Sequence, residues 1–442
     1  MEHYFVRTFG CQMNKHDSER IAGLLEAEGM LPAESPELAD VVVFNTCCVR
    51  EKADERLYGQ VASLKTLKTG GRPDVLIAVG GCIGQRDGTH LRKRLPHVDV
   101  VFGTHNIGSL PALLDAARQG RPSVQILDEG ETFASDLPSR REHPWHAWVS
   151  ITVGCDNYCS YCIVPYVRGH ERSRVLEAVV AEAEALVADG VVEITLLGQN
   201  VNSYGRDLYG KPRFAEVLRA VAATGVQRVR FATSHPKDLC GETIRAMAET
   251  PQVCKSLHLP VQSGSSRTLA AMNRIYTREH YLGLVSELRS AMPDLALSTD
   301  VIVGFPGETD EDFADTLDLF QQIGFDQAFT FIYSPREGTP AASMPQRVPK
   351  AVIQERFDSL VEVVQSSAAA CNERLVGTTQ QILIVGRSKR DEDMLTGRTG
   401  SNKVVHVPAR DVETQRLRSG SFIDVEIDEA QTWFLLGHPL NK

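Results

Sequence analysis

Three cysteines follow three strand-like segments at nearly equal intervals in the first third of the chain. HYFVRTFG precedes Cys11, DVVVFNT precedes Cys47 and DVLIAVGG precedes Cys82, so the cysteines are separated by 36 and 35 residues. A helical pattern, SERIAGLLEAEG, follows the first segment. Strands that alternate with helices at this spacing predict a doubly wound parallel sheet. We therefore expect all three cysteines at the carboxyl edge of the sheet, where such sheets bind ligands.

The first domain is expected to span residues 1–134. A fourth strand is predicted at VDVVFG, after the turn at Pro96, and a helix near LPALLDAARQG. The segment SDLPSRREHPWH, residues 135–146, is rich in proline and charge and is predicted to be a linker.

The middle region, residues 147–373, contains six strand candidates separated by helical patterns. The candidates are WVSITVG, VEITLLG, RVRFAT, KSLHLPV, LALSTDVIVGF and AFTFIYS. A complete eight-fold barrel takes about 250 residues, so six units predict a laterally open barrel. Its active face should be the carboxyl end of the strands, with a side gap that admits a bulky substrate.

The pattern changes after a long amphipathic helix predicted over residues 349–373. Short strands are predicted at QQILIVG, KVVHVP, SFIDVEID and TWFLLG, with turns such as GRTGSN, which indicates a small antiparallel barrel over residues 375–442. The predicted fold class is therefore α/β: an N-terminal doubly wound parallel sheet, a central open (β/α)6 partial TIM barrel and a C-terminal small antiparallel β-barrel.

The stretch CDNYCSYC follows the first strand of the central region and contains Cys155, Cys159 and Cys162. In a reducing compartment, such a cluster is more often a metal site than a disulfide framework. Three thiolates on a four-iron cubane leave one iron open to a substrate, and the spacing differs from that of electron-transfer ferredoxins. The alternative is a zinc site completed by Cys240 or His170.

The shared strand-end position of Cys11, Cys47 and Cys82 predicts a second cluster site. Cys48 adjoins Cys47 and either could be the ligand, although Cys47 alone keeps the strand-end register. A lone cysteine at a strand end is more often a small buried hydrophobe, and only the shared register of the three strand ends argues otherwise. The remaining cysteines, Cys48, Cys240, Cys254 and Cys371, are expected to be structural residues.

The motifs TFGCQMNKHDSE, NTCCVREKADER, GGCIGQ, CDNYCSYCIVPYVRGHERSR, LLGQNVNSY, SGSSRTLAAMNRIYT, TDVIVGFPGET and YSPREGTPAA occur in this order. Together they resemble the tRNA methylthiotransferases of the radical S-adenosylmethionine superfamily, and the C-terminal part resembles the TRAM domain of that family. The resemblance covers essentially the whole chain. CQMN-x2-DSE and NTC-x-VRE look like the branch that acts on isopentenyladenosine, whereas Cys48 stands where the family pattern has a small polar residue.

The resemblance implies an enzyme with two 4Fe-4S clusters that places a methylthio group on carbon 2 of isopentenyladenosine at tRNA position 37. It assigns Cys11, Cys47 and Cys82 to an auxiliary cluster and the later triad to the catalytic one. S-adenosylmethionine would be both methyl donor and radical source. Implied partners are tRNA, a flavodoxin-like or ferredoxin-like electron donor, and sulfur or cluster supply proteins. Alternatives are relatives acting on threonylcarbamoyl-adenosine or a ribosomal-protein aspartate, and a noncatalytic zinc protein that binds RNA.

Polar residues after the predicted central strands are candidate contacts for the cofactor, because that face holds the ligands of a barrel. The candidates are Tyr161, Gln199, Asn200, Gln262, Ser263, Asp300 and Gly304. Candidate RNA contacts are Arg168, with Arg172 and Arg174 nearby, and Arg398 and Lys403 in the last domain.

Net charge and hydropathy set two further expectations. The formal charge of -10 argues against nonspecific binding of polyanions, so RNA recognition would need local basic patches. No apolar run of about 18 residues is present, and the chain is expected to be cytoplasmic, with no membrane partner.

Overall fold

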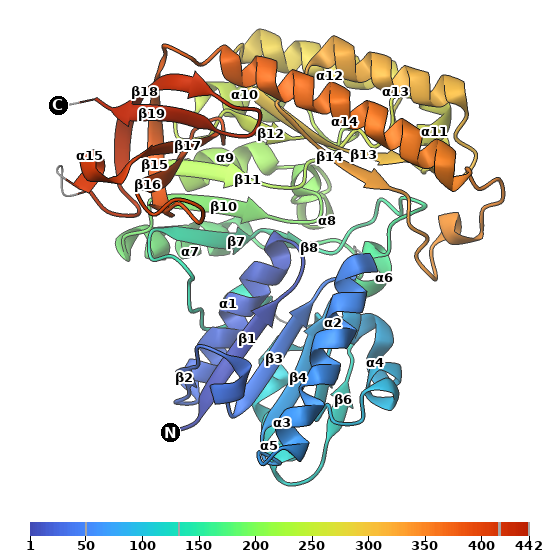
Figure 1. Cartoon of the computed structure of the whole chain (residues 1–442), viewed down its shortest axis with the longest axis vertical. Coiled ribbons are helices and arrows are strands. Elements are labelled where there is room, and N and C mark those ends of the chain that lie inside the picture. Colours follow the sequence, from blue (N-terminus) through green and yellow to red (C-terminus); the bar gives the residue numbers. More distant parts are fainter. Residues whose placement is uncertain (49–50, 131–132, 414–416, 441–442) are drawn as a thin grey trace. The chain divides into compact units, whose positions relative to one another are not determined.

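The computed structural model describes residues 1–48, 51–130, 133–413 and 417–440 (Figure 1). The chain forms two compact units. Unit 1 comprises residues 1–142, 148–158 and 162–174, and unit 2 comprises residues 143–147, 159–161 and 175–442. Val49 and Arg50, which belong to the NTC-x-VRE motif, lie outside the described residues.

Unit 1 contains a six-stranded parallel sheet in the order β2-β1-β3-β4-β5-β6. The predicted doubly wound sheet is confirmed, but β2 and β6 were missed because they are only two and three residues long. The strands are β1 His3–Thr8, β2 Leu31–Pro32, β3 Val41–Thr46, β4 Leu76–Gly81, β5 Val100–Phe102 and β6 Ser123–Gln125. The helices are α1 Gln12–Ala27, η1 Pro36–Leu38, α2 Glu51–Ser63, α3 Lys65–Thr69, α4 Cys82–Arg94, η2 Ile107–Ser109, α5 Leu110–Arg118 and η3 Ala134–Asp136.

The sheet is covered on both faces, which explains why its central strands are continuous apolar runs. Every residue of β3 and β4 is buried. One apolar cluster packs α1 and α5 against the sheet, and a second cluster packs α2 and α4 against the other face. Chain segments 148–158 and 162–174 also belong to this unit, with β8 Thr152–Val153, α6 Val164–Arg168 and β9 Arg172–Ser173.

Residues 135–142 of the predicted linker pack against α1 within unit 1. Arg20 donates to the carbonyl of Leu137 across 2.6 Å, and the amide of Arg140 donates to the carbonyl of Glu19 across 2.9 Å. Gly23 permits this approach, since a Cβ there would lie 2.4 Å from the carbonyl oxygen of Pro138.

All six strands predicted for the central region are present, in two sheets with the orders β11-β10-β7 and β12-β13-β14. A parallel bridge joins Val229 to Val253 and continues the arrangement from β11 toward β12. β7 and β14 are the outermost strands of this arrangement, so the barrel is open, as predicted. The strands are β7 His146–Ser150, β10 Glu193–Leu197, β11 Arg228–Phe231, β12 Ser256–His258, β13 Ala296–Val303 and β14 Gln327–Ile332.

Helices alternate with the central strands, and α13 and α14 lie beside β13 and β14 (Figure 1). Thr309 and Asp312 form a capping box that begins α13. The long predicted helix is present as α14 Lys350–Glu373. The other helices are α7 Leu176–Ala188, η4 Val201–Ser203, α8 Arg206–Tyr209, α9 Phe214–Ala223, α10 Gly241–Glu249, α11 Ser266–Ala271, α12 Arg278–Ala291, α13 Asp310–Ile323 and η5 Pro340–Ser343.

The C-terminal region is a closed barrel in the order β15-β16-β17-β19-β18, and all but one of its strand pairs are antiparallel. The predicted barrel is confirmed, but the expected GRTGSN turn is partly wrong, since Gly397–Thr399 belong to β16. Gly397 lets that strand lie against Ile382, whose side chain occupies the space a Cβ would need. The elements are β15 Thr379–Arg387, β16 Met394–Thr399, β17 Val404–Pro408, α15 Ala409–Glu413, β18 Phe422–Ala430 and β19 Leu435–Pro439.

Two arginines of β11 attach this barrel to the central strands within unit 2. Arg228 donates to the carbonyls of Arg398 and Gln381 across 2.8 and 2.9 Å. Arg230 donates to the carbonyl of Thr399 across 2.8 Å and to Glu193 Oε2 across 2.7 Å. No described helix is long and apolar enough to cross a membrane.

Candidate functional site

Cys11, Cys47 and Cys82 follow the carboxyl ends of three neighbouring strands, β1, β3 and β4. The register pairs Thr8 with Asn45 and Thr46 with Gly81, so the three strands end at one edge. The boundary between β1 and β3 is the topological switch point, because the helices after these strands cover opposite faces. Connections at a switch point separate and leave room for a ligand.

The thiols of this edge interact in pairs. A hydrogen bond from the Cys47 thiol and the positive charge of Arg168 lower the pKa of Cys11 to about 6. A hydrogen bond from the Cys48 thiol, with Arg168 again contributing, lowers the pKa of Cys82 to about 7. Metals bind thiolates, so lowered thiol pKa values fit a set of metal ligands. The four thiols of Cys11, Cys47, Cys48 and Cys82 therefore form one polar cluster at the strand ends.

Cys48 differs from its neighbour in its surroundings. Its side chain belongs to the apolar cluster that contains Val79 and Ile83, and it is fully buried. The hydrogen bond to Cys82 and burial raise the pKa of Cys48. Cys47 instead faces Cys11 and lies against Gly10, where a Cβ would be 2.2 Å from the Cβ of Cys47.

Cys11 contacts a network of buried polar side chains. In its thiol form Cys11 donates to Oδ1 of Asn14 across 3.3 Å, and the side-chain Nδ2 of Asn14 donates to the carbonyl of Thr46 across 2.8 Å. Asn45 returns a hydrogen bond to the carbonyl of Asn14 across 2.8 Å. Asn14 and Asn45 are both nearly inaccessible, so these bonds hold the start of α1 against the end of β3.

The loop that contains Cys155, Cys159 and Cys162 follows β8, and its residues divide between the two units. In unit 1, the amide of Cys155 donates to the carbonyl of Gly169 across 3.1 Å, and Asn157 Nδ2 donates to the sulfur of Cys155 across 3.4 Å. Tyr158 has a φ of 46°, a strained value for a residue with a side chain. Cys155 and Cys162 are partly exposed.

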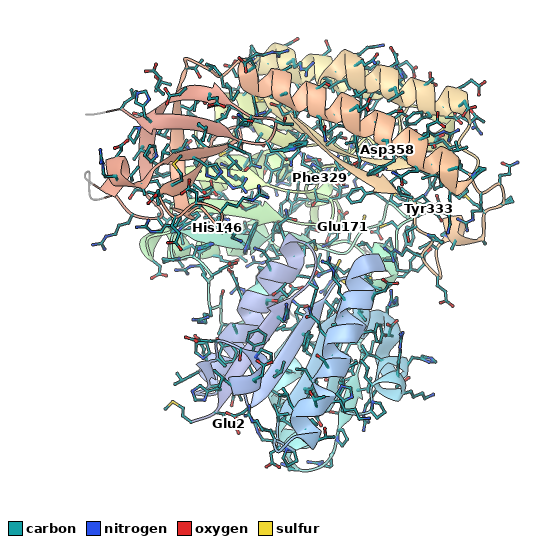
Figure 2. All side chains as sticks on the ribbon, in the orientation of Figure 1. Glu2, His146, Glu171, Phe329, Tyr333 and Asp358 are labelled. Atoms are coloured by element: carbon teal, nitrogen blue, oxygen red, sulfur yellow. The ribbon has the colours of Figure 1, made fainter. Side chains whose placement is uncertain are left out.

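In unit 2, Cys159 is buried and its neighbours are firmly held. The amide of Ser160 donates to the carbonyl of Met272 across 3.0 Å, and the amide of Ala341 donates to the carbonyl of Ser160 across 2.8 Å. Tyr161 and Tyr333 both pack against a small apolar cluster that contains Phe305. Tyr333 directly follows β14, and Phe329 lies within that strand (Figure 2).

Of the seven cofactor candidates, Asn200 has the most informative surroundings. It is 1% exposed, and its Nδ2 donates to Oδ2 of Asp238 across 2.7 Å, while its Oδ1 has no hydrogen-bond partner among the described residues. Gln199 lies beside it after β10 and is partly buried.

Three further buried polar atoms near Asn200 lack a partner within the described part of the chain, and they belong to residues that were not predicted from the sequence. They are Asn202 Nδ2, Ser234 Oγ and His235 Nε2, and their residues are at most 7% exposed. His235 Nδ1 accepts from the amide of Lys237 across 3.2 Å, so Nε2 carries the ring hydrogen. Burial and the nearby Arg274 lower the pKa of His235 to about 2. The sequence did contain a signal: polar residues follow β11 in ATSH, just as they follow β10 in GQN.

The remaining cofactor candidates follow β12 and β13. The backbone of Gln262 pairs with Asp300 and Ile302, with a φ of 71° at Gln262, and Ser263 Oγ lies 3.5 Å from Thr316 Oγ1. Asp300 Oδ1 lies 3.4 Å from His258 Nε2. The amide of Gly304 donates to Glu308 across 2.9 Å.

Gly304 has a packing reason to lack a side chain. Its φ is +75°, and a Cβ there would lie 2.6 Å from Ile353 on α14. Glu308 in turn accepts from Arg356 of α14 across 2.7 Å. These contacts hold the turn GFPG, residues 304–307, against α14. A contact of Gly304 with the cofactor stays a prediction.

The predicted RNA contacts have different surroundings. Arg168 is 4% exposed and pairs with Asp17 across 2.9 Å, which leaves little surface for an RNA backbone. Lys403 pairs with Asp326 across 2.6 Å and is mostly buried. Arg398 is exposed and donates to Oδ1 of Asn402 across 3.0 Å. Contact of these residues with RNA stays a prediction, and Arg398 is the candidate with accessible surface.

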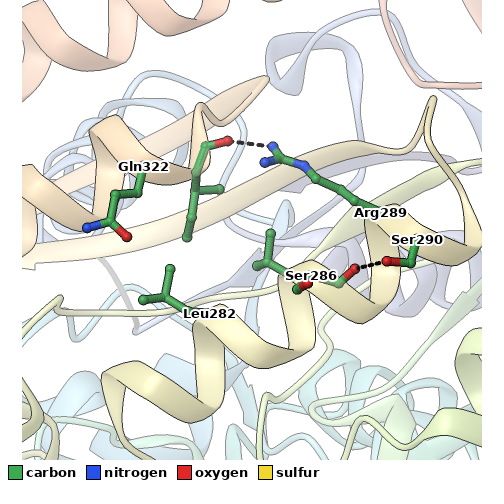
Figure 3. A pocket seen from close by; sticks show the side chains of 7 residues that line it. Leu282, Ser286, Arg289, Ser290 and Gln322 are labelled. Atoms are coloured by element: carbon green, nitrogen blue, oxygen red, sulfur yellow. Dashed lines mark hydrogen bonds between the residues drawn. The ribbon is translucent and has the colours of Figure 1, made fainter.

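A cavity of about 420 Å³ between α12 and α13 is lined by Leu282, Ser286 and Gln322 among others (Figure 3), on the helical layer rather than at strand ends. Among described residues, no three His, Cys, Asp or Glu side chains are grouped closely enough to ligate one metal ion.

Known proteins resemble this chain along its whole length. Residues 149–320 match the Radical SAM superfamily, residues 3–103 match the Uncharacterized protein family UPF0004, and residues 373–440 match the TRAM domain. Proteins named tRNA-2-methylthio-N(6)-dimethylallyladenosine synthase from Acidothermus cellulolyticus and Salinispora arenicola are 51% and 52% identical. Each alignment covers 97% of this chain and 86% of the relative.

Solved structures share the fold at low sequence identity. The radical S-adenosylmethionine methyltransferase TsrM from Kitasatospora setae, solved with cobalamin and a [4Fe-4S] cluster, has a TM-score of 0.57 and 15% identity. That match covers 77% of this chain and 74% of TsrM. The cobalamin-dependent S-adenosylmethionine radical enzyme OxsB has a TM-score of 0.52 and 11% identity, over 83% of this chain and 56% of OxsB.

Proposed function

Because the chain belongs to the family of tRNA-2-methylthio-N(6)-dimethylallyladenosine synthases, we propose that it adds a methylthio group to carbon 2 of N(6)-isopentenyladenosine at tRNA position 37. The hydrogen on carbon 2 is not acidic, so its replacement calls for radical chemistry rather than a general base. S-adenosylmethionine and iron-sulfur clusters, when bound, supply the radical, the methyl group and the sulfur. The contribution of the protein is to hold these groups and the adenosine.

The observation that carries the proposal is the meeting of Cys11, Cys47 and Cys82 at one sheet edge. A radical enzyme that only cleaves its cofactor needs one thiol triad, whereas insertion of sulfur calls for a second site that stores it. The lowered pKa values of Cys11 and Cys82 suit thiolate ligands. These three residues would hold the auxiliary 4Fe-4S cluster.

Cys155, Cys159 and Cys162 would hold the catalytic 4Fe-4S cluster. The hydrogen bond from Asn157 to the sulfur of Cys155 is a contact of the kind that tunes such clusters. Tyr161 would support the cofactor from its apolar cluster with Phe305.

The unpartnered atoms of Asn200, Asn202, Ser234 and His235 fit the polar groups of S-adenosylmethionine. Buried polar atoms without partners are rare in native proteins, and a bound ligand is one reason for them. Ser234, Asn202 and His235 present donors, and Asn200 presents an acceptor. The low pKa of His235 keeps its ring neutral, so it can donate from Nε2 without adding charge.

The TRAM domain would bind the tRNA, with Arg398 as a backbone contact. Electrons would come from a flavodoxin-like or ferredoxin-like donor, and sulfur and clusters from supply proteins.

Two measurements test the function. Anaerobically purified protein should contain about eight irons with matching sulfide, and replacement of Cys155, Cys159 and Cys162 by alanine should leave about half. Nucleosides from a deletion strain should lack 2-methylthio-isopentenyladenosine, and plasmid-borne protein should restore it. Zinc without iron would contradict the enzymatic function, and loss of a different modified nucleoside would indicate one of the other methylthiotransferase substrates.

A further inference from the structure

Helix α6 brings Arg168 into the core of unit 1. Ile163 and Val167, on either side of its first turn, are buried in the apolar cluster that contains Cys48 and Cys82. Thr104 Oγ1 also donates to the carbonyl of Val167 across 2.8 Å. The backbone that carries Arg168 is therefore held by packing and by a hydrogen bond.

The guanidinium of Arg168 is buried in an ion pair. Its Nη2 donates to Oδ2 of Asp17 across 2.9 Å and lies 3.5 Å from Oδ1 of Asn14, the residue that accepts from Cys11. Asp17 Oδ1 lies 3.2 Å from Nδ1 of His16, whose Nε2 lies 3.1 Å from Ser135 Oγ. Arg168, Asp17 and His16 are each at most 4% exposed. The attraction between two buried charges often does not repay the cost of removing them from water, so a pair of this kind is a candidate for a functional role.

The thiols beside the pair indicate such a role. Oδ1 of Asn14 is 3.5 Å from Nη2 of Arg168 and 3.3 Å from the sulfur of Cys11, and Arg168 also has a side-chain hydrogen bond with Cys82. An arginine side chain stays protonated even when it is buried, so this positive charge is fixed. Three thiolates on a cubane form a buried anionic group, and reduction adds one more negative charge. A fixed cation next to that group stabilises it, most strongly in the reduced form.

We propose that Arg168 is a positioning residue that supplies fixed positive charge to the auxiliary cluster of Cys11, Cys47 and Cys82, and that Asp17 sets how much of that charge the cluster experiences. This inference rests on the proposed function, since it needs a cluster at the first triad. It assigns Arg168 to the thiol site rather than to RNA. The segment after the catalytic cysteines thereby tunes the auxiliary site.

The test uses full-length protein with Cys155, Cys159 and Cys162 replaced by alanine, so that the remaining iron belongs to the first triad. Iron and sulfide are measured, and the midpoint potential is determined by a titration followed by electron spin resonance. Arg168→Met should lower the potential, because the reduced cluster loses its counter-charge. Asp17→Asn should raise it, because Arg168 is no longer neutralised. Arg168→Lys should stay near the parent, because the charge is kept.

Arg174→Met is the matched control. Arg174 is a second buried arginine of unit 1, 4% exposed, and it donates to the carbonyl of Ser150 across 3.0 Å. Its replacement should leave the potential unchanged. A purely structural role of Arg168 would not produce shifts of opposite sign at Arg168 and Asp17.

The outcomes separate this inference from the proposed function. If the parent triple variant contains no iron, the auxiliary cluster itself is wrong and the inference falls with it. If iron is retained but Arg168→Met and Asp17→Asn leave the potential unchanged, the inference alone is overturned. Arg168→Met could lose its iron, and the other two variants then decide. A midpoint potential of Arg168→Lys close to that of the parent, with a raised potential in Asp17→Asn, supports the inference. Loss of iron in all three variants overturns it.

Discussion

The side-chain amide of Asn200 donates to Oδ2 of Asp238 across 2.7 Å, and Oδ1 of Asn200 stays buried, with no partner in the part of the chain that the structure describes. Asp238 itself is held by Arg206 and Lys237, across 2.7 and 2.9 Å. The orientation of the Asn200 amide is therefore set by charged neighbours before any ligand binds, which is the preorganisation that a binding site needs.

We expect Asn200→Ala to weaken binding of S-adenosylmethionine to cluster-loaded protein by roughly tenfold, because one hydrogen bond to a buried ligand is lost. Equilibrium dialysis measures the affinity. Asn372→Ala is the matched control. Asn372 lies on α14, is also buried, and donates from its side-chain amide to the carbonyl of Gln431. Equal weakening in both variants would show a general loss of structure.

His235 should make stability depend on pH. Its pKa is about 2 in the folded protein, well below that of a free imidazole, so between these values the unfolded chain binds more protons. This contribution is fully present above about pH 6.5 and is lost as the pH falls below it. Between pH 7 and pH 5 the loss is roughly 2 kcal/mol.

His235→Gln should therefore lose less stability than the parent over the same pH range. Denaturant unfolding at both pH values measures the difference. An equal fall in the free energy of unfolding in the two proteins would mean that His235 is protonated in the folded state.

Cys47 and Cys48 should differ in their effect on iron content. Cys47→Ser should lose the iron of the first triad, because Cys47 faces Cys11 at the strand end. Cys48→Ser should keep it, because the hydrogen bond to Cys82 and burial raise the pKa of Cys48 and disfavour the thiolate that iron binds. Iron analysis in the Cys155, Cys159 and Cys162 triple-alanine background distinguishes them, and the reverse result would make Cys48 the ligand.

Arg230 should anchor the C-terminal barrel. Arg230→Met leaves Glu193 buried without its partner, and we expect a loss of about 3 kcal/mol in the free energy of unfolding. The double variant Arg230→Met with Glu193→Gln removes the unpaired charge and should recover part of the loss. Urea unfolding followed by circular dichroism tests both, and a single variant as stable as the parent would contradict this role.

Much of the architecture could be predicted because it depends on local patterns. The apolar runs before Cys11, Cys47 and Cys82, with helical patterns between them, allow a parallel sheet with right-handed crossovers and little else. That topology brings the three strand ends to one edge whatever the side chains are. Strands β2, β6 and β16 were not predicted. They are short or contain glycine and charge, and they form because they pair with neighbouring strands.

The site was predictable only in part. The cysteine triads follow from spacing, and Asn200 follows from its position after a strand. Asn202, Ser234 and His235 were missed because polar residues after strands are ordinary in sequence, and only their burial without partners marks them.

Periodicity and connection length act within a few tens of residues, so the local pattern was enough to predict which elements form and which strand ends carry the thiols. The burial of Arg168 could not be predicted in this way, because the run of charges in VRGHERSR is typical of a solvated surface. Its environment is set by Asp17, 151 residues earlier in the chain. Whether a charge is solvated or buried depends on such distant partners, because the free energy of burying it is recovered only when the fold brings an opposite charge to it.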